Sequence, residues 1–302
     1  MQGEPHAPAA VRASDRQAWR RASAIVTSAA APRWPVQDQP WRYASVLVVC
    51  LLSACTAVSA SGAQQEKATA VSRASAIHLA LAQGYLQRGE PGVALGEINA
   101  ALQDAPNNAQ EIATRALIES ALGENDAALQ DYHAALVSAP ASTAIRQDYG
   151  WLLCSQGNYV QAIAQFRQAL QDDAQRSRSI DADIELDRGI CEYRAGNLHG
   201  ARLDLQQALL IKPLDPAART NLALVDFRSN APMAALREIA IVNGSAGANA
   251  QSLWLGVLLA HHQSDWADTQ RWSAELINQF PSSRWAILAE QQSYGDTSIF
   301  KY

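Results

Sequence analysis

A 34-residue period in small residues constrains the fold of this chain more than any other feature of its sequence. Ala94, Ala128 and Ala162 are each 34 residues apart, and a second alanine follows each of them after seven residues. The pair recurs at Ala201 and Ala208 after an offset of 39 residues, which implies an insertion of five. A period of this length predicts an array in which each helical unit packs on its neighbours.

A second periodic series predicts the turn inside each unit. One residue that favours turns lies five positions before the first alanine of five units, at Gly89, Gly123, Gly157, Gly196 and Asn230. A helix that ends and reverses there needs a residue in the left-handed conformation, which glycine adopts at low cost and asparagine tolerates. Each unit is therefore predicted to contain a helix A, a tight turn, and a helix B that carries the two alanines.

The residues of helix B predict how the two helices pack. Two alanines seven positions apart lie on one helical face and allow a close approach between helices. A larger residue four positions after the first alanine fills the space between them, at Ile98, Tyr132, Phe166 and Leu205. Breaks are expected near Pro106, Pro140 and Pro213. We expect the insertion, within residues 172–181, to be an exposed loop because it is rich in acids, arginines and serines.

This pattern resembles the tetratricopeptide repeat. The best match is the unit that contains Tyr149, Gly150, Ala162, Phe166 and Ala169. Four units match well, and two weaker ones follow, with Leu222, Ala223, Ala235 and Ile239 in the fifth and Leu255, Gly256, Trp272 and Pro281 in the sixth. The resemblance implies an all-α superhelical solenoid of about six helix-turn-helix repeats over residues 75–292, with a tail at 293–302. The scarcity of aromatic and alternating β-branched residues also favours helices over sheet.

The longest apolar run, residues 43–54, follows Arg42 and ends in Leu52-Ser53-Ala54-Cys55. Twelve residues are too few to cross a bilayer but are typical of the apolar core of a signal peptide. The end of the run resembles a bacterial lipobox, which implies cleavage before Cys55 and acylation of that cysteine. An ordinary secretory signal and a buried apolar segment are the alternatives. Thr56 stands where lipoproteins retained at the inner membrane carry aspartate, which points to the outer membrane.

The segments around the lipobox have different expected roles. Residues 1–35 are expected to be an extension that precedes the true start of translation, which we place near Val36. Residues 36–54 are the expected lipoprotein signal peptide, and the polar residues 55–74 are the expected lipidated, flexible tether. Two or three acyl chains hold a protein durably without a spanning helix. We therefore expect the mature protein on the periplasmic face of the outer membrane.

Composition and motifs argue against several classes of function. A formal net charge of −5 with interleaved acids and bases offers no basic face for nucleic acid. The sequence has no Gly-rich phosphate loop, no His-x-x-x-His pair and no Gly-x-Ser-x-Gly turn. Adjacent His261 and His262 project about 100° apart on a helix, which does not suit a shared metal. We therefore predict a protein that is not an enzyme, with no catalytic residue, cofactor, metal or small-molecule substrate.

Two of the four cysteines are expected to remain in the mature, unmodified chain. Cys50 would leave with the signal peptide, and Cys55 would carry the acyl chains. Cys154 and Cys191 both lie late in helix A of adjacent units, and neighbouring A helices run side by side in such a stack. An oxidising periplasm would then favour a disulfide between them. The alternative is two separate buried thiols that behave as small apolar residues.

Tetratricopeptide arrays bind partners in a concave groove lined by helix A. The groove positions here include Leu79, Gln83, Leu86, Leu117, Gln147, Trp151, Ile190 and Tyr193. A mainly apolar strip favours docking of a protein segment, and Trp151 is the strongest candidate because aromatic residues often dominate binding. The alternative is that these side chains form ordinary core. The carboxylate clamp of co-chaperone repeats is absent, since its positions hold Leu79, Gln83, Thr114, Ala144 and Asp148.

Two stretches are more specific than the generic repeat. They read YGWLLCSQGNY at residues 149–159 and SLWLG at 252–256, the latter followed by FPSS at 280–283. Together with the lipobox they resemble the type IV pilus biogenesis and stability lipoproteins, the pilotins of the pilus secretin, from Cys55 to about Ser283. The resemblance implies binding to the secretin subunit, its localisation and multimer assembly in the outer membrane, pilus biogenesis and twitching motility. The alternatives are an envelope scaffold lipoprotein for cell-wall or outer-membrane assembly enzymes, and a periplasmic enzyme subunit.

Overall fold

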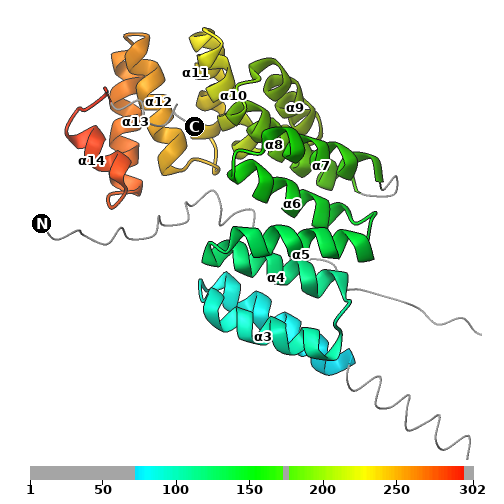
Figure 1. The fold of residues 1–302 in the computed structure, drawn as a ribbon. Helices are drawn as coiled ribbons and strands as arrows, with labels where there is room; N and C mark the ends of the chain where they lie inside the picture. Colours follow the sequence, from blue (N-terminus) through cyan, green and yellow to red (C-terminus); the bar gives the residue numbers. More distant parts are fainter. Residues whose placement is uncertain (1–71, 173–176, 296–302) are drawn as a thin grey trace, which may run out of the picture. The chain divides into compact units, whose positions relative to one another are not determined.

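The computed structural model describes residues 72–172 and 177–295 (Figure 1). All regular secondary structure in these residues is helical, and no strand occurs among them, so the predicted all-α, tetratricopeptide-type solenoid is confirmed. The predicted signal peptide, Cys55 and most of the predicted tether lie outside the described residues. No helix in the described ranges is both long enough and apolar enough to cross a membrane.

The chain divides into two compact units, of which the first ends at Gly123. Its described part consists of a helix over residues 72–87, α3 (Pro91–Asp104) and α4 (Ala109–Leu122). The helices α3 and α4 pack together. Nδ1 of His78 lies 2.7 Å from Oε2 of Glu97, which joins residues 72–87 to α3. Ser75 donates a hydrogen bond to the buried carboxylate of Glu111, which joins the same helix to α4.

The second unit begins at Glu124 and contains ten described helices, each packed against the next (Figure 1). They are α5 (Asn125–Ser138), α6 (Thr143–Ser155), α7 (Tyr159–Asp172), α8 (Arg178–Arg194), α9 (Leu198–Ile211), α10 (Pro216–Arg228), α11 (Pro232–Asn243), α12 (Ala250–His262), α13 (Trp266–Gln279) and α14 (Arg284–Glu290). The A helices α6, α8 and α10 also contact one another in succession, as expected for stacked helix-turn-helix units.

The turns between helices A and B have the predicted backbone. Gly89, Gly123, Gly157 and Gly196 have φ values between 80° and 83°, and Asn230 has a φ of 58°. The structure adds a sixth member that the sequence pattern did not reveal. Ser264 also has a φ of 58° and lies 34 residues after Asn230. A serine in the left-handed conformation is uncommon, so the sixth turn is imposed by the packing of α12 against α13.

The periodic alanines of the first five helix-turn-helix repeats lie in the core. The eight paired alanines and Ala235 are at most 2% exposed, and the larger residues between them, together with Ile239, are fully buried. The sixth repeat departs from this rule, because Thr269 and Ser273 occupy the positions of the first alanine and of the larger residue. Trp272, 2% exposed, fills the space instead.

The indole of Trp272 can pack against α12 because residue 256 is a glycine. A Cβ atom added to Gly256 would lie 2.7 Å from Cε3 of Trp272 and 2.6 Å from Nδ2 of Asn243. We expect Gly256→Ala to lower the free energy of unfolding by about 1–3 kcal/mol, because the buried indole would have to shift. Gly96→Ala, within α3, is the control, since a Cβ atom there meets nothing within 4 Å. It should raise stability by about 0.5–1 kcal/mol. Urea titrations of both variants measure the difference, and equal effects would contradict the packing argument.

The five-residue insertion is only partly a loop. The predicted exposed loop reached residue 181, whereas α8 begins at Arg178 and has 17 residues against 13 in α6 and α10. Residues 178–181 therefore form the first turn of α8. Ile180 is half-buried and packs against the core cluster around Phe166, which explains why this turn is ordered as helix. Asp181 in this turn also favours a helix N-terminus.

Candidate partner-binding surface on α6 and α8

The helix α6 carries three candidate residues on one face. Trp151 lies four positions after Gln147 and three after Asp148, so its side chain is a neighbour of both on the helix surface. The opposite side of α6 is fixed by the core. A Cβ atom on Gly150 would lie 3.0 Å from the ring of Phe166 in α7, so the two helices are in close contact at this point.

The helix α8 is held in place by ion pairs. The guanidinium group of Arg188 donates to both carboxylate oxygens of Asp204 in α9, at 2.7 and 2.6 Å. It also donates to Glu185 at 2.6 Å. Lys212, after α9, pairs with Asp183 at 2.8 Å. A bidentate, half-buried pair of this kind restricts the rotation of α8, so its remaining face is presented in a defined orientation.

The faces of α6 and α8 meet at two points. Nε2 of Gln147 donates a hydrogen bond to Oδ2 of Asp187 at 2.6 Å. The guanidinium carbon of Arg194 lies 5.1 Å from the centroid of the Trp151 ring, within the range of a cation–π contact. We call the resulting surface the α6–α8 strip, which consists of Gln147, Asp148, Trp151, Asp187, Ile190 and Arg194, all of them half-buried.

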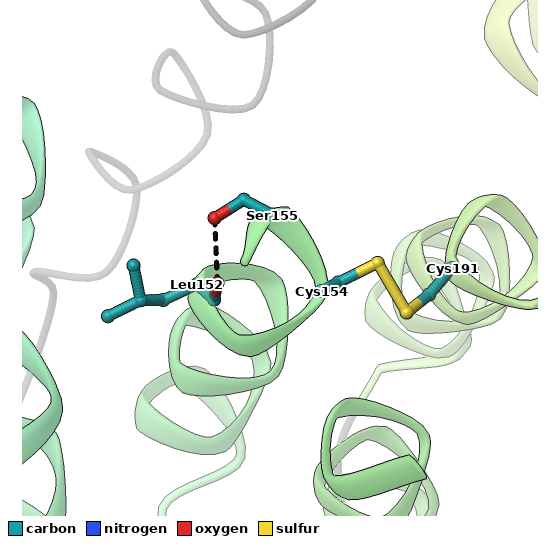
Figure 2. Close-up of a disulfide and its surroundings, with 4 residues drawn as sticks. All are labelled: Leu152, Cys154, Ser155 and Cys191. Carbon is teal, nitrogen blue, oxygen red and sulfur yellow. Dashed lines mark hydrogen bonds between the residues drawn. A yellow bond between two sulfur atoms is a disulfide. The ribbon is translucent and has the colours of Figure 1, made fainter. Parts of the chain in front are cut away.

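A disulfide joins the same two helices. Figure 2 shows the side chains of Cys154 in α6 and Cys191 in α8 pointing toward each other. Their Cα atoms are 5.8 Å apart, and both residues are at most 2% exposed. Ser155 donates a hydrogen bond to the carbonyl of Leu152 at 2.7 Å, beside the disulfide (Figure 2). The cross-link fixes the separation of the helices that carry the α6–α8 strip.

The strip contains an acidic pair with unusual electrostatics. Burial, together with a smaller contribution from the charge of Asp187, raises the pKa of the Asp148 carboxyl to about 7. Burial also raises the pKa of Tyr132 in α5, with a second contribution from Asp148. Tyr132 is fully buried, and its hydroxyl group has no hydrogen-bond partner among the described residues. Its ring stacks on Tyr149 with the centroids 5.7 Å apart.

The structure separates the predicted groove residues into two sets. Leu79, Gln83, Leu86 and Leu117 are half-buried and belong to the first unit, whereas Gln147, Trp151 and Ile190 are half-buried and belong to the second. Tyr193 is only 2% exposed and lies in the core of the second unit, with the guanidinium carbon of Arg228 4.9 Å from its ring centroid. It is therefore not available to a partner.

The electrostatic coupling of Asp148 in α6 to Asp187 in α8 was not predicted from the sequence. A signal for it was present, since each aspartate lies two residues before a helix A glycine, Gly150 or Gly189. Equivalent positions in adjacent A helices lie side by side in a stack, so the register alone brings the two carboxylates together. No group of three or more histidine, cysteine, aspartate or glutamate residues in the described ranges could hold a metal ion.

The match to a family model agrees with this architecture. Residues 112–183, which include all of α6 and α7, match the model described as tetratricopeptide repeat. The chain has a tetratricopeptide-repeat domain. Within this domain, the α6–α8 strip belongs to the A helices of the third and fourth repeats.

The relatives of this chain differ in the share of their own length that the chain matches. It is homologous to the type IV pilus assembly protein PilF of Pseudomonas aeruginosa, with 25% identity over 79% of this chain and 94% of PilF. The crystal structure of PilW, described as a widely conserved type IV pilus biogenesis factor, has a TM-score of 0.64 and 27% identity over 72% of this chain and 98% of PilW. Human tetratricopeptide repeat protein 16 is 30% identical over 47% of this chain, which spans only 17% of that relative.

Proposed function

We propose that this protein is a type IV pilus assembly factor that acts as a pilotin. It binds the secretin subunit of the pilus and promotes its localisation and multimer assembly in the outer membrane, and thereby pilus biogenesis and twitching motility. The observation that carries this proposal is the similarity to PilF over 94% of that protein's length, because a match confined to generic repeats would cover only a part. The likeness to PilW over 98% of its chain supports the same role.

The proposed mechanism is escort of the secretin subunit by a lipid-anchored carrier. Acyl chains on Cys55 would hold the protein at the periplasmic face of the outer membrane. The α6–α8 strip would bind a segment of the secretin, with the indole of Trp151 as an aromatic anchor. The disulfide between Cys154 and Cys191 and the Arg188–Asp204 pair fix the two helices before binding, which lowers the entropy lost on association.

The test in cells is deletion of the gene, followed by immunoblotting of the outer-membrane fraction for heat-resistant secretin multimers. The deletion strain is complemented with wild type, Cys55→Ala or Trp151→Ala. We expect multimers to be restored by wild type and by neither variant. Normal multimers and normal twitching in the deletion strain would disprove the pilotin role.

The test in solution isolates the contribution of Trp151. We expect Trp151→Ala to weaken binding of the purified secretin subunit by roughly tenfold to a hundredfold, as is typical of an aromatic hot spot. Trp266→Ala is the matched control, because Trp266 is a tryptophan on α13 that is 58% exposed and lies outside the strip. Surface plasmon resonance with immobilised secretin subunit measures both. Equal losses in the two variants would place the binding site elsewhere.

A further inference from the structure

We propose that one face of the helix over residues 72–87 binds the surface of an anionic lipid bilayer. Arginines bracket the apolar residues of this lipid-binding face, which consists of Arg73, Ala76, Ile77, Ala80, Leu81 and Arg88, all of them exposed. These residues share one side of the helix because they recur at spacings of three, four or seven positions. The proposal rests on the lipid anchor of the proposed function and adds to it a second, non-covalent contact that orients the first repeat on the membrane.

The exposure of Ile77 is exceptional for its position in the repeat. Ile77 is 60% exposed, and Leu81, one turn later, is 43% exposed. The residues at the position of Ile77 in the five later repeats, twelve before the left-handed turn, are at most 3% exposed: Glu111, Ile145, Ile184, Ala218 and Ser252. In a stack this position faces the preceding repeat, and Ser75 of the first helix covers Glu111 in this way. No repeat precedes the helix among the described residues, so its large apolar side chains need another cover.

The charge of this part of the chain selects an anionic surface. Residues 67–89 contain one lysine, two arginines and one histidine and no aspartate or glutamate, although the whole chain has a formal net charge of −5. Apolar side chains between cations are typical of a helix that lies in the membrane interface, where arginine meets lipid phosphate and the apolar residues enter the acyl region. Arg88 also pairs with Glu90 at 3.1 Å, which offsets part of its charge, so Arg73 is the arginine to test.

The position of the helix in the chain favours a bilayer over a second copy of the protein. Sixteen residues separate the helix from Cys55, the acylated residue of the proposed function, and they span at most about 60 Å. The anchor would therefore keep the lipid-binding face near the membrane at a high effective concentration. A symmetric pair of these helices would instead place arginines against arginines, whether the two helices ran parallel or antiparallel.

The test uses the chain from residue 55 onward with Cys55→Ser, which retains every described residue and carries no acyl chain. Flotation with vesicles of phosphatidylethanolamine and phosphatidylglycerol measures binding, and vesicles of phosphatidylcholine alone are the neutral comparison. We expect binding to the anionic vesicles that weakens as the salt concentration rises. Arg73→Gln should weaken this binding about fivefold. Arg167→Gln, which removes an exposed arginine from α7, should leave it unchanged.

Apolar substitutions assign the contact to this helix. Ile77→Gln combined with Leu81→Gln should weaken binding by about tenfold or more, because it removes the side chains that enter the bilayer. Ile287→Gln combined with Leu210→Gln is the matched control, since these residues are 48% and 71% exposed on α14 and α9. The control should bind as the unsubstituted chain does. Circular dichroism checks that both double variants fold.

A fluorescent label reports the depth of the helix independently of affinity. With Cys55 replaced and Cys154 and Cys191 joined in their disulfide, Ile77→Cys supplies one reactive thiol for a polarity-sensitive dye. Its emission should shift to the blue on anionic vesicles, whereas that of a dye at Ile287→Cys should not. Absence of binding by the unsubstituted chain, or equal binding by the glutamine double variant of the helix, would overturn the proposal. A dimer that this variant loses, seen by light scattering without any vesicle binding, would assign the face to a second copy instead.

The outcome is separable from that of the proposed function. If the unacylated chain binds anionic vesicles through Ile77 but secretin multimers form normally without the gene, the lipid-binding face stands and the pilotin role fails. If the multimers require Trp151 but the chain does not bind the vesicles, the pilotin role stands and the lipid-binding face fails.

Discussion

Replacing both Cys154 and Cys191 with alanine is expected to lower the free energy of unfolding by about 4 kcal/mol. The two cysteines are 37 residues apart in sequence, and in the chain-entropy model a cross-link that closes a loop of this size stabilises by about that amount at 25 °C. Both sulfur atoms are buried, so their loss adds a small cavity cost. Urea unfolding followed by circular dichroism measures the change.

The control for this prediction is reduction of the wild-type protein. A reductant should lower the unfolding midpoint of wild type toward that of the double alanine variant and should leave the variant unchanged. Hydrogen exchange should show the loss of protection concentrated in α6 and α8, because the disulfide joins these two helices. A wild-type midpoint that does not respond to the reductant would contradict the prediction.

The substitution Asp148→Asn is expected to stabilise the protein in alkaline solution. Burial and the charge of Asp187 raise the pKa of Asp148 to about 7 in the folded state, against 3.8 for the ordinary group. Between these values the unfolded chain releases the proton that the folded chain keeps, so the stability of wild type falls as pH rises from about 4 to about 7. The asparagine variant lacks this loss. At 1.36 kcal/mol for each pKa unit, with some screening by water at a half-buried site, we expect a gain of roughly 2–4 kcal/mol at pH 8.

Urea titrations at pH 4 and pH 8 test both the sign and the size of this effect. The gain from Asp148→Asn should be small at pH 4, where the aspartate is protonated in the folded state, and should reach its full value above pH 7. Asp126→Asn, at the start of α5, should instead lower stability slightly at pH 8, because it removes a favourable charge from a helix N-terminus. A gain from Asp148→Asn that is the same at both pH values would show that ionisation of Asp148 has no part in it.

The repeat frame could be predicted from the order of residues alone. The turns at Gly123 and Gly157 have the left-handed backbone that their positions predicted, and alanines such as Ala128 and Ala135 are fully buried. These features were readable because they depend on local chemistry, namely the backbone freedom of glycine and the spacing of small residues along one helical face. The meeting of Cys154 and Cys191 also follows from the register of adjacent A helices.

Packing between helices, by contrast, determines which of the equivalent helix A positions are buried and which residues lie beside them. Tyr193 reads as a groove residue from its position, but packing between the fourth and fifth repeats leaves it 2% exposed. Ser264 forms the sixth turn although serine has no intrinsic preference for it. Asp187 in α8 comes next to Gln147 and acts on the charge of Asp148 in α6 only because these two helices pack together. The physical reason is that burial and electrostatic coupling depend on contacts between helices that are distant in sequence, which local propensity does not encode.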